Sequence, residues 1–256
     1  MLPFEEVETR IPDSHFISLA NFEQTYWWHL TRVERAYKII KKFFPDAGSI
    51  NCVDIGCGAG GFLHLLDEKL GFRERLGVDR SPKAVELARR LDPRYQTVDD
   101  NFTPPSDTNL VFLMDVLEHI NSDEEFLSKL LASMAIGAGV LISVPAYPFL
   151  FSQWDQLLGH HRRYTASSLR KLCKASGGNI QYFGYGFSYL FPAAIIHRVI
   201  MERVLARQSR HVQQYVFPPV PRWLNQLLCG VGRVEASVGN LVHIPFGLSL
   251  YCLLKK

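Results

Sequence analysis

Residues 53–61 read Val-Asp-Ile-Gly-Cys-Gly-Ala-Gly-Gly, an apolar segment that ends in a carboxylate and runs directly into a glycine-rich turn. Such a segment predicts a buried strand, a tight turn and the start of a helix. Glycine suits the turn because the backbone takes positive φ values there and approaches a ligand where a Cβ atom would collide. The segment therefore predicts a nucleotide-cofactor loop. Its expected cofactor-binding residues are Gly56, Cys57, Gly58 and Gly60.

The glycine spacing fits two classes of adenosine cofactor. Gly56, Gly58 and Gly61 also match the pattern of dinucleotide-binding enzymes, so spacing does not choose between a dinucleotide and S-adenosylmethionine. Asp54 favours S-adenosylmethionine, because its carboxylate would repel a pyrophosphate and attract a sulfonium or ammonium group. Asp79 ends the next predicted strand about 20 residues after the loop, where a carboxylate would bind the ribose hydroxyls of either cofactor.

Length and composition limit the class of protein. The 256 residues, 47% of them apolar, suffice for one substantial core, which we interpret as one domain with additions. The formal net charge of +3 comes from charges spread along the sequence and does not support nucleic-acid binding. Five widely spaced cysteines without a Cys-x-x-Cys pair are typical of free thiols in a reducing compartment, not of structural zinc. Because no charged leader precedes an apolar run, we expect a cytoplasmic protein.

Strand and helix signals alternate along the chain. We expect strands near residues 50–55, 75–79, 94–98, 109–114, 138–144, 179–185 and 246–254. Helix starts are predicted at Thr31 with Glu34, Ala59, Ser81 with Pro82, Ser122 with Glu125, and Thr165. This order predicts an α/β fold with a Rossmann-like, mostly parallel, seven-stranded sheet flanked by helices.

The predicted elements divide the chain into four parts. These are an N-terminal cap at 1–48, irregular to about residue 30; a cofactor-binding core at 49–186; a helical insertion or lid at 187–240; and a final core strand within 241–256. The apolar run Phe187–Ile196 is too short to span a bilayer, which takes ~20 residues. Residues 187–210 nevertheless have the pattern of an interfacial helix that contacts a membrane surface. A lid helix packed on the core with a solvated basic face would give the same pattern.

Three motifs together resemble a known enzyme family. The loop at 53–61, the Val-Asp pair at 78 and 79, and Leu-Met-Asp-Val-Leu-Glu-His-Ile at 113–120 are similar to motifs of class I S-adenosylmethionine-dependent methyltransferases. The resemblance covers roughly residues 50–186 and implies S-adenosylmethionine as methyl donor and a leading helix over the cofactor mouth. The pattern Asp-x-x-x-Gly-His-x-Arg-Arg-Tyr at 155–164 more narrowly resembles bacterial methyltransferases related to the ubiquinone and cell-surface biosynthetic enzymes.

The loop after the fifth predicted strand supplies candidate catalytic residues. Methyl transfer from a sulfonium is an in-line displacement that depends mainly on positioning, and a hydroxyl acceptor also benefits from a general base. His160 is the candidate base because its loop lies at the carboxyl edge of the sheet, and a histidine that only holds the loop together is the alternative. Asp155 would orient His160. Arg162 and Arg163 would bind an anionic group of the acceptor, or pair with Asp155 or Glu118.

Acidic residues near other strand ends are candidates for cofactor or metal binding. Asp115, Glu118 and His119 would share one face of a helical turn and bind a divalent ion, as in metal-dependent quinone O-methyltransferases, to which this motif is similar. We predict no metal, and assign Asp115 to the cofactor site, His119 to catalysis and Glu118 to the pocket floor. Asp99 would contact the adenine amino group or cap a turn, and Arg80 would join the cofactor site.

Four aromatic residues are candidates for substrate binding. Trp27, Trp28, Tyr147 and Tyr164 would cover the cofactor or stack on a flat acceptor, although core packing explains large aromatic residues equally well.

The predicted function is S-adenosylmethionine-dependent methyl transfer to an oxygen of a small-molecule or lipid-like intermediate. Methyl transfer to nitrogen or carbon is an alternative within the same fold. A dinucleotide-dependent oxidoreductase would leave Asp54 without a favourable role. A non-catalytic cofactor-binding module would need no polar residues at 155–164.

Overall fold

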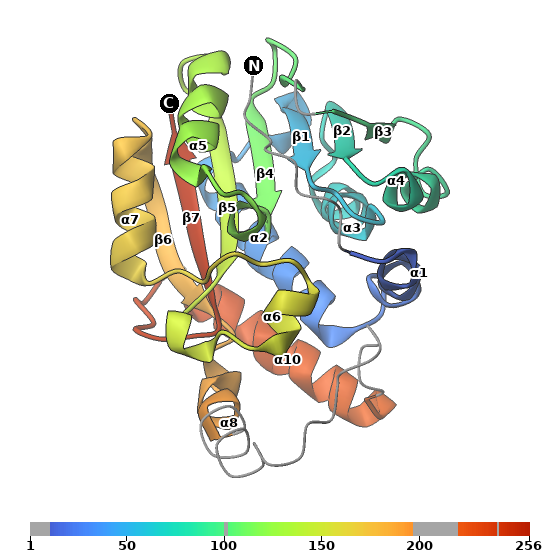
Figure 1. Ribbon diagram of the computed structural model, residues 1–256, viewed down its shortest axis with the longest axis vertical. Coiled ribbons are helices and arrows are strands. Elements are labelled where there is room, and N and C mark those ends of the chain that lie inside the picture. The colour runs from blue at the N-terminus through green and yellow to red at the C-terminus, as the bar shows by residue number, and fades with distance from the viewer. Residues whose placement is uncertain (1–10, 100–101, 197–219, 240) are drawn as a thin grey trace.

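The computed structural model describes residues 11–99, 102–196, 220–239 and 241–256, and is built around one seven-stranded sheet (Figure 1). The strands are β1 Asn51–Ile55, β2 Glu74–Asp79, β3 Gln96–Thr97, β4 Leu110–Met114, β5 Gly139–Pro145, β6 Asn179–Gly186 and β7 Ser249–Lys255. Their spatial order is β3-β2-β1-β4-β5-β7-β6. The first five strands are parallel, and β7 is antiparallel to both β5 and β6. The predicted fold class is confirmed.

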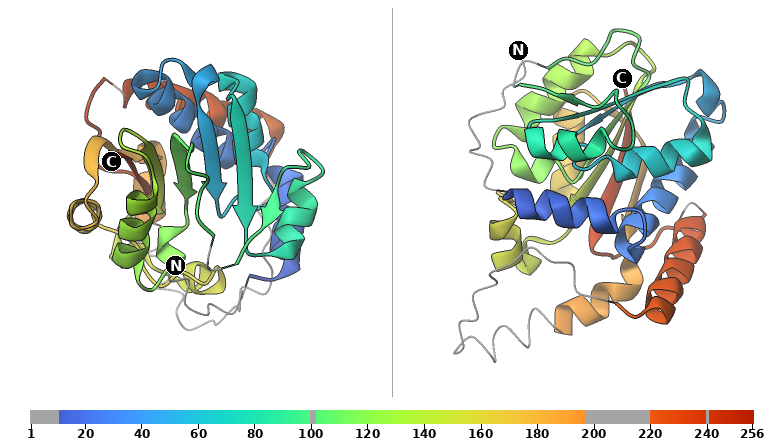
Figure 2. Two further views of the ribbon diagram at one scale, coloured as in Figure 1. Left: turned by 90° about the horizontal axis from the view of Figure 1, so that it is seen from above. Right: turned by 90° about the vertical axis from the view of Figure 1, so that its right-hand side faces the viewer.

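Helices cover both faces of the sheet (Figures 1 and 2). Those within the described residues are α1 Asp13–Phe22, α2 Trp27–Phe43, α3 Gly61–Leu70, α4 Pro82–Ala88, α5 Asp123–Ser133, α6 Gln153–Leu157, α7 Ala166–Ala175, α8 Phe191–Ile195 and α10 Arg222–Val238. Alternate residues of β4 show the two layers: Leu110 and Phe112 pack with α2 and α3, whereas Val111 and Leu113 pack with α5 and α7. Strands buried on both faces are continuous apolar runs, which is why they were recognisable in the sequence.

Several helix starts match their sequence signals. Ser81 caps α4 by accepting a hydrogen bond from the Ala84 N–H, with Pro82 at the first helical position. Thr165 caps α7 in a reciprocal box with Ser168. Ser122 precedes α5, but its side chain makes no cap hydrogen bond.

The N-terminal region differs from the prediction. Residues 13–22 form α1 instead of an irregular segment, and α2 begins at Trp27, so the predicted start at Thr31 is wrong. The Trp27 N–H donates to the Asn225 side chain of α10 at 2.9 Å. The first turn of α2 is therefore completed by a residue distant in sequence, which a local capping pattern cannot reveal.

The predicted insertion supplies two described helices, α8 and α10, and α10 packs along α2. Residues 197–210 of the predicted interfacial segment lie outside the described residues. Within the part of the chain that the structure describes, no helix combines the length and the apolar character needed to cross a membrane. The final strand begins at Ser249, three residues later than Phe246.

Candidate functional site

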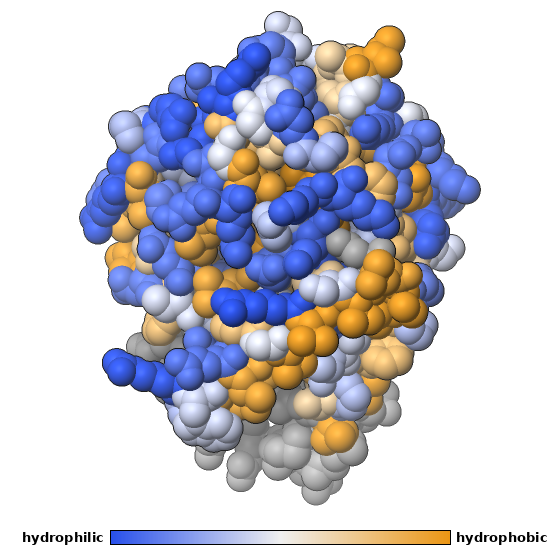
Figure 3. Space-filling model, turned by 180° about the vertical axis from the view of Figure 1, so that it is seen from behind, coloured by the Kyte–Doolittle hydropathy of each residue, from blue (hydrophilic) through white to orange (hydrophobic). Residues whose placement is uncertain are grey.

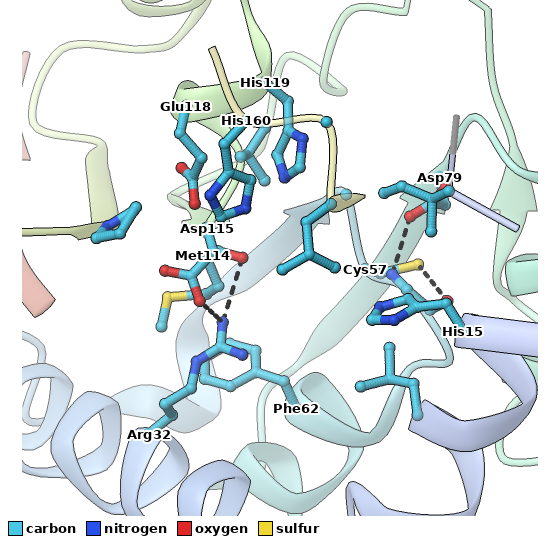
Figure 4. A pocket seen from close by; sticks show the side chains of 18 of the residues that line it. His15, Arg32, Cys57, Phe62, Asp79, Met114, Asp115, Glu118, His119 and His160 are labelled. Carbon is cyan, nitrogen blue, oxygen red and sulfur yellow. Dashed lines mark hydrogen bonds and ion pairs between the residues drawn. The ribbon is translucent and has the colours of Figure 1, made fainter. Parts of the chain in front are cut away.

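A cavity of ≈ 620 Å³ lies at the carboxyl ends of the parallel strands, which is where open α/β sheets bind ligands. Its walls come from β1, β2 and β4, from α1 and α2, and from the loop that contains α6 (Figure 4). The volume falls within the range typical of small-molecule sites. Because α1 and the start of α2 lie at the carboxyl ends of the strands (Figure 2), the N-terminal part of the chain forms a cap over the cavity.

The glycine loop forms one wall of the cavity. Gly56, Gly58 and Gly60 have φ values of 75°, 57° and 87°, which residues other than glycine rarely adopt. Gly56 and Gly58 line the cavity together with Cys57, whereas Gly60 lies behind the wall, where a Cβ atom would stand 2.9 Å from the Tyr95 ring. Gly60 thus allows close packing against Tyr95, and its contact with the cofactor stays a prediction.

Asp79 holds this loop in place. One carboxylate oxygen accepts from the Gly58 N–H at 2.9 Å, and the other accepts from the Ser81 N–H at 2.8 Å. The side chain also lines the cavity, as does Arg80. Each carboxylate oxygen can accept more than one hydrogen bond, so Asp79 retains capacity for a hydroxyl donor from a ligand.

Asp54 lies at the tip of β1 and is 2% exposed. Among the described residues, its Oδ1 atom has no hydrogen-bond partner. Burial raises the pKa of Asp54 well above its ordinary value, and the nearby Arg32 opposes the rise only in part. A cationic ligand group would satisfy this carboxyl group and lower its pKa again.

Glu23 and Arg32 belong to the cavity and were not anticipated. Glu23 accepts a hydrogen bond from the Gly61 N–H, the first residue of α3, at 2.8 Å. Burial raises the pKa of Glu23 to about 8 despite this hydrogen bond. Arg32 pairs with Asp115 at 3.0 Å and donates to the Met114 carbonyl at 3.2 Å (Figure 4). The carboxyl groups of Asp54 and Glu23 and the guanidinium group of Arg32 thus all line the cavity.

Glu118, His119 and His160 form a polar cluster on the opposite wall, with candidate ligand atoms that all lie within 4.8 Å of one another. The two imidazole rings meet edge to face at 4.7 Å. Glu118 is fully buried, and neither carboxyl oxygen has a hydrogen-bond partner among the described residues. Burial raises the pKa of Glu118 well above its usual value and lowers that of His119 to about 3. Burial therefore favours the uncharged form of both side chains.

The predicted grouping of Asp115 with Glu118 and His119 is wrong. Asp115 has a φ of 60°, and the turn after it, Leu117–His119, is a 3-10 helix, so the spacing that aligns residues on an α-helix does not apply. Asp115 turns to Arg32 and also accepts from the Ser143 hydroxyl at 3.0 Å. A metal ion at this wall would be held by Glu118, His119 and His160.

Asp155 organises the loop between β5 and α7. It is fully buried in α6, and its Oδ2 atom accepts from the backbone N–H and hydroxyl of Ser152. Its Oδ1 atom lies 2.9 Å from His160 Nδ1 and 2.8 Å from Arg163 Nε. Burial alone would raise the pKa of Asp155, but the hydrogen bonds from His160 and Arg163 hold it below its usual value. Asp155, His160 and Arg163 all line the cavity.

Several predicted substrate residues lie outside this cavity. Arg162 pairs with Asp123 at 3.0 Å, and the Tyr164 hydroxyl donates to the same carboxylate at 2.7 Å. Tyr147 stacks on Tyr185 with ring centroids 5.7 Å apart. These side chains therefore pack and brace the loop instead of lining the cavity.

Of the remaining predicted residues, the two tryptophans line the cavity and Asp99 does not. Trp27 and Trp28 line the cavity, and Trp28 stacks on Phe187 at 3.9 Å. Asp99 is not among the lining residues, whereas its neighbour Val98 is, and the contact of Asp99 with the adenine amino group stays a prediction.

A family model described as a methyltransferase domain matches residues 27–182. The chain belongs to this methyltransferase family. The class predicted from the glycine loop is thereby confirmed at the level of the family.

Individual relatives of this methyltransferase are distant. Trans-aconitate 2-methyltransferase of Rhodopseudomonas palustris is 28% identical over 95 residues, which cover 36% of this chain and 37% of that protein. The match thus spans well under half the length of the curated relative.

Solved structures with the same fold include the plantazolicin methyltransferase BpumL in complex with a monoazolic desmethylPZN analog and SAH. Its TM-score is 0.58 at 17% identity, and the match covers 94% of this chain and 88% of that chain. The [4+2]-cyclase SpnF has a TM-score of 0.55, 15% identity, and coverage of 95% and 93%. At these identities the likeness shows the fold alone.

Proposed function

We propose that this chain is an S-adenosylmethionine-dependent methyltransferase that methylates an oxygen atom of a small-molecule or lipid-like intermediate. Membership of the methyltransferase family supports the reaction class, and the position of the cavity against the glycine loop supports the donor. S-adenosylmethionine supplies an electrophilic methyl group on a cationic sulfur. Since a chain of this fold is also known as a cyclase, the fold itself does not carry the proposal.

The cavity wall at β1 and β2 fits this donor. Asp79 retains hydrogen-bond capacity for ribose hydroxyls, and the unpartnered oxygen of Asp54 would accept from an ammonium group. The amide at the start of α3, where a diphosphate would bind, already donates to the Glu23 carboxyl group. This last contact speaks against the alternative of a dinucleotide-dependent oxidoreductase.

The interaction that carries the proposed catalytic role is the 2.9 Å contact between Asp155 and His160 at the cavity wall. It engages His160 Nδ1, so Nε2 is the nitrogen left to accept a proton from the acceptor hydroxyl. Arg163 balances the charge of Asp155, which keeps that carboxylate ionised beneath the histidine. His119, with a pKa lowered to about 3, is a far weaker base than an ordinary imidazole.

Apolar residues complete the acceptor side of the cavity. Trp27, Trp28, Leu150 and Leu158 line it, and together with the uncharged Glu118 and His119 they favour a neutral, flat or partly aliphatic acceptor. Arg162 and Arg163 are engaged in ion pairs, so an anionic acceptor finds less support than was expected from the sequence. We retain from the sequence the proposals of a cytoplasmic location and of peripheral membrane contact through residues 187–210.

Calorimetry with S-adenosylmethionine and with NAD tests the donor. We expect heat of binding with S-adenosylmethionine only, and weaker binding after Asp79→Ala, because the loop carboxylate is lost. Binding of NAD without binding of S-adenosylmethionine would overturn the reaction class.

Radiolabelled S-adenosylmethionine offered with a panel of phenols and polyprenyl phenols tests the base. His160→Ala should lower kcat by about 100-fold or more while leaving the donor Kd unchanged. His161→Ala, which alters the exposed neighbouring histidine, is the matched control and should retain turnover. Equal turnover of the two variants would refute the role of His160.

A further inference from the structure

Helix α10 presents an unbroken line of exposed apolar side chains, which we call the α10 stripe. Its members recur at intervals of three or four residues, the spacing of one helix face, and continue just beyond the end of the helix. They are Trp223 (67% exposed), Leu227 (54%), Val231 (38%), Val234 (63%), Val238 (42%), Leu241 (87%) and Val242 (61%). Figure 3 shows apolar side chains gathered in a diagonal band across this side of the molecule.

The opposite face of α10 is firmly held by the body of the protein. Asn225 bonds to the start of α2, and the buried Glu235 pairs with Arg35 at 3.5 Å. Gly232 packs so closely on Thr31 that a Cβ atom at that position would overlap the threonine side chain. The stripe is therefore the outer face of a well-anchored helix, and the described core offers no place to bury it.

The exposed charged side chains of α10 are of one sign. Arg222 and Arg233 are exposed, whereas the acidic residue of the described segments 220–239 and 241–246, Glu235, is buried and paired. Lys42 lines the same surface pocket as Leu241 and Val242 at the far end of the stripe. An apolar strip flanked by cations, with an amphipathic tryptophan at one end, complements a bilayer with anionic headgroups.

We propose that the α10 stripe is the surface by which this protein lies on an anionic phospholipid bilayer. The helix is about 25 Å long, so its outer face offers roughly 250 Å². A stable protein–protein interface needs about 800 Å² from each partner. A symmetric pairing of two stripes would also bring the Arg222 and Arg233 side chains of both copies into one interface, with no exposed carboxylate on the helix to meet them.

Docking through α10 would bring the cavity close to the membrane. The inner face of α10 contacts the start of α2, and Trp27 and Trp28 in that turn line the cavity. One helix diameter, about 10 Å, thus separates the bilayer surface from the acceptor side of the cavity. This extends the proposed function, on which it rests, by placing a lipid-like acceptor within reach from the membrane.

Vesicle co-sedimentation tests the surface without requiring turnover, so its outcome is independent of the proposed reaction. The full chain should bind vesicles that contain phosphatidylglycerol and bind phosphatidylcholine vesicles much less. The triple variant Leu227→Ser, Val231→Ser, Val234→Ser should lose at least about tenfold in partitioning. Ile136→Ser is the control: it removes an aliphatic side chain that is 92% exposed, more than any of these three, and lies outside the stripe, so this variant should bind like the wild type.

Charge reversal separates the two contributions. Arg222→Glu and Arg233→Glu should each weaken binding to anionic vesicles by at least about fivefold. Because all these positions are exposed, thermal unfolding should show the variants to be folded. Equal sedimentation of the triple variant and the wild type, or no binding to either vesicle, would overturn the proposal. A dimer in analytical ultracentrifugation that the triple variant abolishes would assign the stripe to a second copy instead.

Discussion

Glu23 offers a direct test of the electrostatics of the cavity. Its side chain is 6% exposed and accepts from the Gly61 N–H. In the folded chain, burial raises its pKa from 4.5 to about 8. Glu23→Gln keeps an oxygen for the same amide while removing the titration, so the variant isolates the cost of burying this charge.

The sign and size of the effect follow from proton linkage. Between pH 4.5 and 8, the folded chain keeps the Glu23 proton that the unfolded chain has lost, so the free energy of unfolding falls as pH rises. The contribution is fully present below pH 4.5 and is lost by about pH 8. The loss is at most about 1.4 kcal/mol per pH unit and becomes smaller close to each of the two pKa values, so it amounts to roughly 3–4 kcal/mol between pH 5 and pH 8. Relative to the wild type, the free energy of unfolding of Glu23→Gln should therefore rise by about 3–4 kcal/mol across this interval.

Urea denaturation of both proteins at pH 5, 6, 7 and 8 measures this difference. Contributions from other buried groups, such as Asp54, largely cancel because both proteins contain them. Glu68→Gln, which alters a carboxylate with a side chain 61% exposed, is the control and should follow the wild-type curve. Parallel pH curves for Glu23→Gln and the wild type would refute the reasoning, because they would mean that Glu23 is charged in the folded chain.

Two further predictions follow from packing and from the polar cluster. Gly77→Ala should lower the free energy of unfolding, measured by urea denaturation, by about 1–3 kcal/mol, because its Cβ would overlap the buried Tyr95 ring. Gly230→Ala, where the added Cβ has open space around it, is the control and should not destabilise the chain. Equal stability of the two variants would show that Tyr95 moves aside without cost. Methyl transfer should survive EDTA, because burial favours the protonated, uncharged form of Glu118, which is a poor metal ligand; loss of activity that a divalent cation restores would make Glu118, His119 and His160 a metal site.

The core was predictable because its signals are local. The buried strands are short apolar runs, and the turn after β1 carries glycines at positions with positive φ. The N-terminal cap was not predictable in the same way, because the start of α2 is completed by Asn225 from the other end of the chain. Helix α6 is a different case. Its Ser152–Asp155 capping box is a local signal within the segment that is predicted from the sequence to be a loop.

The site residues likewise divide into those that local sequence signals predict and those that depend on tertiary packing. Asp54 and Gly58 follow from the loop motif and Asp79 from the Val-Asp pair that ends the next strand, and each lies in the cavity wall. Glu23 and Arg32 escaped prediction because they reach the cavity only through the packing of α1 and α2. The partners of the two loop arginines were likewise set by tertiary structure, which neutralises them with Asp123 and Asp155.

The position of β7 has a consequence for synthesis on the ribosome. This strand fills the gap between β5 and β6, although β6 ends at Gly186 and β7 begins only at Ser249. While the intervening segment is translated, β6 has no neighbour and β5 lacks one of its two. Until residue 255 has left the exit tunnel, the nascent chain thus leaves open the two strand edges that β7 later covers, one on β5 and one on β6. This interval is therefore the period in which it most needs a chaperone.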